Sequence, residues 1–211
     1  MTDRSRPDQD AEIGSDGGPT RIYSQSARIF HWITALLVLP MIPVGYIMSD
    51  SASPIKISEA VQSQLYSAHK LVGFVLLWLT VARLIYRFTH GAPASEPTLT
   101  AWQKGSSHAT HWLLYGLLIG MSLSGWIGVS YYAAISRDVF GLFSLPAVTP
   151  IDQKMSVTVF VYHYFGALAL IGLGSLHIGA ALYHHLVRHD AVLASMWPGL
   201  LRRSRADDAQ V

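Results

Sequence analysis

The sequence predicts an all-α integral membrane protein, folded as a single four-helix bundle. Three observations predict this fold class. Hydrophobic residues make up 51% of the 211 residues and charged residues only 13%, a composition too apolar for an ordinary soluble domain. Four apolar runs are long enough to cross a hydrocarbon core of roughly 30 Å as helices. Neither a charge run nor a Pro/Gly-rich linker divides the chain into separate units.

The predicted transmembrane helices cover residues 28–48, 64–87, 108–131 and 157–187. Residues 1–20 are polar and acidic with no apolar stripe to bury, so we expect a disordered tail. We do not expect this tail to act as a signal peptide, because its basic start is followed by acids rather than by an apolar core. The expected organisation is a tail over residues 1–20, a membrane domain over 21–199 and a basic and polar C-terminal tail over 200–211.

Lys and Arg are distributed unequally between the two sides of the membrane. With four spans, both chain ends lie on the same side. That side carries Arg4, Arg6, Arg21, Arg28, Arg83, Arg87, Lys104, Arg188, Arg202, Arg203 and Arg205, and the other side carries Lys56, Lys70, Arg137 and Lys154. Basic residues accumulate on the cytoplasmic side, so we expect both termini there. The net charge of +2 then reflects topology and not nucleic-acid binding.

Cysteine is absent from the chain. Its absence excludes disulfides, thiolate metal sites, iron–sulfur clusters and covalent haem attachment through CxxCH. Histidine and methionine are therefore the soft ligands that remain for a metal.

Two histidines of the last predicted helix, His163 and His177, share one of its faces. They are fourteen residues apart, which at about 100° per residue returns to within roughly 40° of the same face and rises about 21 Å. His69, early in the second helix, is level with His163. His31, early in the first helix, is level with His177, and His111 of the third helix reaches the same depth as His31. Two histidine pairs stacked across a bilayer predict two bis-histidine b haems between the helices, which carry electrons and have no open site for oxygen.

Other interpretations of these histidines are open. A single intramembrane histidine often makes only an interhelical hydrogen bond, although ionisable groups in hydrocarbon are costly and usually functional. A copper or zinc centre normally recruits Cys, carboxylate or a water-filled opening. Gly73, Gly166, Gly172 and Gly174 suit a flat macrocycle, and they equally suit close helix packing. A haem-free transporter would need broken helices and intramembrane acids that the sequence lacks.

Residues 23–199 contain several short motifs. They are SARIFHW, AHKLVG, VARLIYRFTHGAP, HWLLY, SLSGWIGVS, YHYFGALAL, SLHIGAALYHH and DAVLASMWPG. Together they resemble the bacterial cytochrome b561 family of four-helix dihaem proteins, which is similar to the b-type subunits of nickel–iron hydrogenases. The resemblance implies His31 with His177 as ligands of a cytoplasmic haem b, and His69 with His163 as ligands of a periplasmic one, in a bacterial inner membrane.

The resemblance also implies an activity. The family's best understood branch oxidises superoxide and reduces ubiquinone, so we expect a superoxide:ubiquinone oxidoreductase, a superoxide oxidase. Its partners would be membrane lipid, a quinone, and superoxide or a periplasmic redox protein as donor, with no nucleic acid. The alternative is a non-catalytic membrane anchor and electron-transfer subunit for a periplasmic dehydrogenase or hydrogenase.

Polar residues near the two expected haems are candidates for the quinone site and for contacts with the haems. Arg83, His111 and His184 are similar in position to residues of a quinone and proton site, and Arg87 to a residue that contacts haem. Positive-inside anchoring is the alternative for the arginines. Lys70 directly follows His69. It is expected either to pair with a propionate of the outer haem or to attract an anion such as superoxide.

Overall fold

The computed structural model describes residues 22–49 and 54–199. Within these residues the chain forms long α-helices, one β-hairpin and a short π-helix. In chain order they are α1 (Gln25–Ile47), α2 (Glu59–His90), α3 (Ala101–Tyr131), β1 (Asp138–Val139), β2 (Phe143–Ser144), α4 (Gln153–Tyr183) and η1 (His184–Arg188). The tails expected over residues 1–20 and 200–211, and the arginines in them together with Arg21, lie outside the described residues.

Each long helix begins before its apolar run, because a polar side chain caps its N-terminus. Ser24, Ser58 and Asp152 each accept a hydrogen bond from the backbone N–H three residues further on. Thr100 and Gln103 form a reciprocal capping box at the start of α3. Such caps satisfy N–H groups that a helix leaves unpaired. The helices therefore start earlier than residues 28, 64, 108 and 157, the starts that hydropathy alone predicts.

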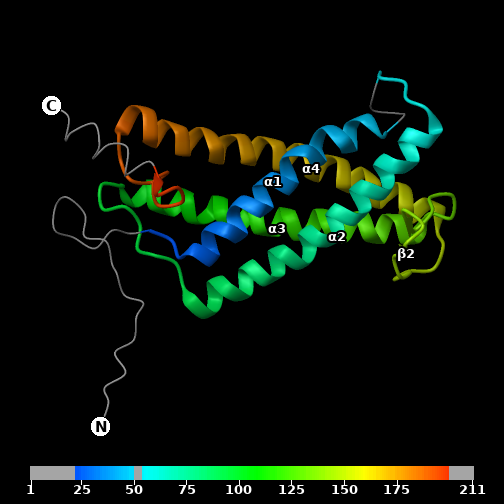
Figure 1. Cartoon of the computed structure of the whole chain (residues 1–211), viewed down its shortest axis with the longest axis horizontal. Helices are drawn as coiled ribbons and strands as arrows, with labels where there is room; N and C mark the ends of the chain where they lie inside the picture. The colour runs from blue at the N-terminus through cyan, green and yellow to red at the C-terminus, as the bar shows by residue number, and fades with distance from the viewer. Residues whose placement is uncertain (1–21, 50–53, 200–211) are drawn as a thin grey trace, which may run out of the picture.

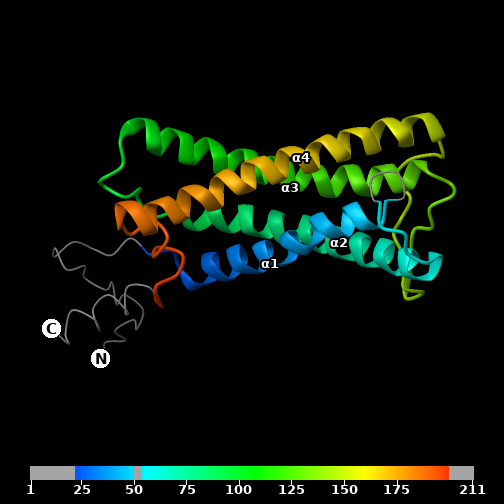
Figure 2. The same cartoon turned by 90° about the horizontal axis from the view of Figure 1, so that it is seen from above.

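Successive long helices run in opposite directions along the long axis of the molecule, as Figures 1 and 2 show. α1 packs on α2, α2 on α3 and α3 on α4, so helices that are adjacent in sequence are adjacent in space. Within the described residues there are four helices long and apolar enough to cross a membrane. Large apolar side chains such as Leu36, Phe88 and Leu176 are exposed along them, as expected of a surface that contacts lipid. The predicted all-α four-helix bundle is confirmed.

The two ends of the bundle differ (Figure 1). One end holds the beginning of α1, the connection between α2 and α3, and the residues after α4; we call it the terminal end. The other end holds the hairpin, in which Asp138 pairs with Ser144 and Val139 with Phe143; we call it the hairpin end. Gly141 in the hairpin turn has a φ of 72°, a conformation that glycine adopts without strain.

Candidate functional site

Two histidine rings of α4 each lie opposite a histidine ring of another helix, one on α1 and one on α2. Near the terminal end, the ring centroids of His31 on α1 and His177 on α4 are 6.1 Å apart, with an interplanar angle of 69°. Near the hairpin end, those of His69 on α2 and His163 on α4 are 6.3 Å apart, at 67°. The predicted depths allowed both pairings, although they also left His111 open at the level of His31. One ring geometry thus recurs at two levels of a single helix.

The histidine pairs join helices that are not close neighbours. α4 packs closely on α3, and α1 and α2 pack closely on each other. In the described part of the chain, α4 makes no comparably close backbone contact with α1 or α2. The imidazoles therefore reach across a separation wider than that of packed helices.

A third histidine, His111 of α3, lies beside the pair at the terminal end. Its ring centroid is 5.3 Å from that of His177, and its Nδ1–H donates to the Ser107 carbonyl at 2.7 Å. In the neutral ring, Nε2 is then the nitrogen with a lone pair. A guanidinium nitrogen of Arg83 lies 3.0 Å from Nδ1 of His31.

Arg83 and Arg87 line a small cavity at the terminal end. Arg83 lies 5.2 Å from the ring centroid of Tyr115, and Arg87 lies 5.8 Å from that of Trp112, both within the range of cation–π interactions. The room inside is about 20 Å³, enough for roughly one water molecule. The remaining lining residues are Tyr23, Ala27, Tyr86, Gly91, His111, Tyr115 and Met196. This lining contains two cations and no carboxylate, so it favours a ligand with carboxylate or carbonyl oxygens.

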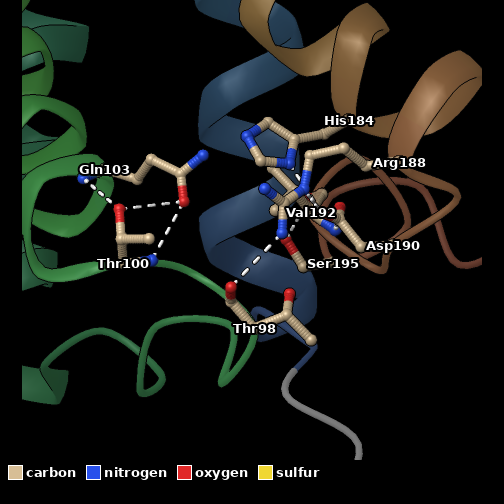
Figure 3. Close-up of polar contacts among 8 residues, drawn as sticks. All are labelled: Thr98, Thr100, Gln103, His184, Arg188, Asp190, Val192 and Ser195. Carbon is tan, nitrogen blue, oxygen red and sulfur yellow. Dashed lines mark hydrogen bonds and ion pairs between the residues drawn. The ribbon is translucent and has the colours of Figure 1, made fainter.

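His184 belongs to a separate cluster, shown in Figure 3. Its Nδ1 lies 2.6 Å from the Asp190 carboxylate, which also accepts from Nε of Arg188 at 3.2 Å. Arg188 donates to the Thr98 carbonyl at 3.2 Å as well, which ties the end of η1 to the α2–α3 connection. His184 is not among the residues that line the cavity. The structure thus brings together Arg83, Arg87 and His111 and holds His184 in another group.

The segment after η1 folds back over the beginning of α1. The backbone N–H of Tyr23 donates to the Ser195 carbonyl at 3.1 Å, and Nε1 of Trp32 donates to the Met196 carbonyl at 3.1 Å. The ring centroids of Trp32 and Trp197 are 5.2 Å apart, and the rings pack edge to face. Because Met196 also lines the cavity, this segment forms part of the cavity wall.

Lys70 contacts the β-hairpin. Its ammonium group donates to the carbonyl of Ser136 at 2.7 Å and to that of Asp138. The helix that carries His69 is therefore tied to the hairpin at the very next residue. Both expected roles of Lys70, toward a haem propionate and toward an anion, stay predictions.

Comparison with known proteins identifies the family. The family model described as prokaryotic cytochrome b561 matches residues 22–199. The chain belongs to the prokaryotic cytochrome b561 family. It is therefore a multi-pass membrane b-type cytochrome that functions in electron transfer, as the resemblance implied, and b-type haem is the cofactor of its family.

Individual relatives are distant in sequence, but the matches cover most of the chain. Cytochrome b561 homolog 2 of Escherichia coli (strain K12) is 25% identical over 174 residues, 82% of this chain and 90% of the relative. Cytochrome b561 homolog 1 of the same organism is 25% identical over 176 residues, 83% of this chain and 97% of the relative. A "Probable Ni/Fe-hydrogenase B-type cytochrome subunit" of Azotobacter vinelandii is 22% identical over 209 residues, 84% of this chain and 86% of the relative.

The ring separation in the two histidine pairs is compatible with a haem iron held between each pair. Imidazole nitrogen binds a first-row metal at about 2 Å, so two rings on opposite sides of one metal have centroids about 6 Å apart. The separations of 6.1 and 6.3 Å agree with this value, whereas the 5.3 Å between His111 and His177 is shorter. Among the described residues, no group of three or more His, Cys, Asp or Glu is arranged to hold a bare metal ion. A haem iron needs only two such ligands, because the macrocycle supplies the others.

Two glycines lie against the rings at the hairpin end. A Cβ at Gly45 would lie 3.1 Å from Cε1 of His69, and one at Gly125 would lie 3.2 Å from Cε1 of His163. Both distances are shorter than an ordinary carbon–carbon contact of about 3.5–4.0 Å, so a methyl group at either position would require the ring to shift. The glycines that the sequence singled out lie elsewhere: Gly73 faces Met41, Gly166 faces Met121, and Gly172 and Gly174 face open space.

Sequence reasoning also missed Ser124 of α3. Its Oγ lies 2.9 Å from Nδ1 of His163 and 3.0 Å from the carbonyl of Met121. Nδ1 of His69, in contrast, is buried without a hydrogen-bond partner among the described residues. Ser124 and Gly125 both belong to the motif SLSGWIGVS, so the available signal was the motif itself, which had no assigned role.

Proposed function

We propose that this cytochrome b561 holds two b haems, one between His31 and His177 and one between His69 and His163. The observation that carries the proposal is the repetition of one ring geometry at two levels of α4. Bound there, haem supplies one-electron oxidation and reduction without an open site for oxygen. The chain would contribute the four imidazoles that hold the haems, the glycines beside two of them, and the apolar bundle around them.

We further propose that the chain is a superoxide:ubiquinone oxidoreductase of the bacterial inner membrane. In this proposal the terminal end, with both chain ends, faces the cytoplasm and the hairpin end faces the periplasm. The support is the distribution of Lys and Arg in the sequence, which favours the side of the chain ends. Two superoxide anions would give up one electron each and leave as dioxygen, and one ubiquinone would take up two electrons and two protons.

The hairpin end is the proposed side of the donor. Lys70 places a positive charge one residue from His69, and Lys56 is exposed on the same side. Positive charge at an entrance raises the encounter rate of a small anion through its long-range field. The carbonyl contacts of Lys70 hold this charge in place, although the Asp138 carboxylate is near enough to offset part of it.

The cavity at the terminal end is the proposed side of the quinone. Arg83 and Arg87 present donors that suit quinone carbonyl oxygens. His111, held through Nδ1 by the Ser107 carbonyl, would take up a proton on Nε2 and pass it to the quinone, and His184 with Asp190 would take part in proton supply near the surface. Since the cavity now has room for about 20 Å³, a quinone ring enters only if wall side chains such as Met196 move aside.

A second function is favoured by one of the comparisons. The likeness to a hydrogenase B-type cytochrome subunit over 84% of this chain supports a membrane anchor and electron-transfer subunit. In that case a periplasmic dehydrogenase or hydrogenase would dock at the hairpin end as the electron donor. Superoxide alone would then not reduce the protein.

The test is superoxide-driven ubiquinol formation by the purified full-length protein. We expect one ubiquinol per two superoxide anions, a rate at least about tenfold lower in His111→Gln, where the proposed proton donor is lost, and an unchanged rate in the exposed control His108→Ala. A protein that contains two haems but is not reduced by superoxide would refute the oxidoreductase and leave the electron-transfer subunit. A colourless protein would refute both.

A further inference from the structure

The hydroxyl of Ser124 lies between a histidine and a backbone carbonyl. Its Oγ is 3.0 Å from the Met121 carbonyl, three residues earlier on α3, and 2.9 Å from Nδ1 of His163 on α4. A hydroxyl has one hydrogen to donate and lone pairs with which to accept. Because a carbonyl only accepts, the arrangement that uses both contacts has Ser124 donating to Met121 and accepting from Nδ1–H of His163.

This arrangement selects one tautomer of His163. With the proton on Nδ1, Nε2 keeps its lone pair and is the nitrogen able to bind a metal. A hydrogen bond from Nδ1–H also fixes the ring orientation and makes Nε2 a stronger donor to the metal. Gly125, the residue after Ser124, has no side chain and lets the ring approach α3.

Two of the other three paired histidines are held differently. Nδ1 of His69 has no hydrogen-bond partner among the residues that the structure describes. Nδ1 of His31 faces Arg83, which can only donate. The hydroxyl contact of His163 is thus not a general feature of the pairs, and its effect belongs to the site at the hairpin end.

We propose that Ser124 is a positioning residue that holds the Nδ1–H tautomer of His163 and thereby lowers the midpoint potential of the haem at the hairpin end. The inference rests on the proposed function, in which His163 is an axial ligand. A stronger axial donor stabilises oxidised iron more than reduced iron, so the hydrogen bond favours the oxidised form. Removing the acceptor should therefore make this haem easier to reduce.

The experiment is an optical redox titration of the full-length protein and its variants. Ser124→Ala should retain two haems and raise the reduced-to-oxidised ratio of the hairpin-end haem by roughly three- to tenfold at a fixed potential, the equivalent of one net hydrogen bond. A tenfold change is a shift of about 59 mV for a one-electron couple. Ser124→Thr, which keeps the hydroxyl, should restore the wild-type midpoint. Ser106→Ala is the matched control, because it removes a similar hydrogen bond to a carbonyl three residues earlier on the same helix.

The outcomes separate this inference from the function on which it rests. The His163→Ala variant identifies the hairpin-end haem as the one that is lost, and retention of both haems would refute the proposed ligand. Two haems with unchanged midpoints in Ser124→Ala would overturn the role of Ser124 and leave the ligand in place. If the alanine variant loses the haem, Ser124→Cys decides: its thiol is a weak acceptor, so its midpoint should exceed that of Ser124→Thr, and equal midpoints overturn the inference.

Discussion

Replacing Gly125 by alanine should reduce haem binding at the hairpin end. The new Cβ would lie 3.2 Å from Cε1 of His163, short of an ordinary carbon–carbon contact by roughly 0.3–0.8 Å. Cε1 is bonded to Nε2, so moving the ring moves the ligating atom by a comparable amount. Disturbing groups that orient a metal ligand typically costs about 10- to 100-fold in affinity. We expect a loss of this size for the hairpin-end haem, with the terminal-end haem unchanged.

The control for this prediction is Gly116→Ala on the same helix. Gly116 is nine residues before Gly125 and so lies about 180° away around α3, where an added Cβ would meet nothing within 4 Å. Both substitutions gain up to about 1 kcal/mol of helix propensity, so only Gly125→Ala should lose haem. The assay is haem quantitation per chain with thermal unfolding of the same samples. Equal haem content in the two variants would refute the reasoning that the ring of His163 needs this space.

Three further perturbations have defined outcomes. Arg83→Gln should keep two haems but slow ubiquinone reduction by about tenfold, because a charge-assisted donor is lost; an unchanged rate of ubiquinol formation would contradict the proposed quinone site. Lys70→Met should destabilise the hairpin end by about 1 kcal/mol, the worth of partly exposed hydrogen bonds, seen as a lower Tm and faster proteolysis of the α3–α4 connection. Asp190→Asn should weaken the contacts of His184 and Arg188 and speed amide exchange over residues 190–199, and unchanged exchange there would show that the carboxylate does not hold this segment.

The depth of a residue in the membrane was predictable from the sequence, and contacts between helix faces were not. The alignment of His31 with His177 and of His69 with His163 followed because a helix rises by a fixed amount per residue. The hydrogen bond between Ser124 and His163, and the fit of Gly45 and Gly125 to the rings, depend on how each helix is rotated about its axis. Hydropathy does not specify that rotation when most of the helix surface is apolar.

The position of His184 depends on a local change of helix type. A regular continuation of the last helix predicts His184 near His111. In the structure α4 gives way to a π-helix at His184, and the turn ends at His189 with a φ of 52°. This turn returns Asp190 to Nδ1 of His184. Regular α-helical spacing does not bring residues six apart together in this way, so the pairing was not visible in the sequence.

The number of haems per chain bears directly on the proposed pairing of the histidines. We would quantify haem in the purified full-length protein and in His163→Ala and His177→Ala, with His108→Ala as the control. We predict two haems in the wild type and in the control, and one in each of the other variants. A wild-type content of one haem, or variants that both keep two, would contradict the assignment of the paired histidines as ligands of two separate haems.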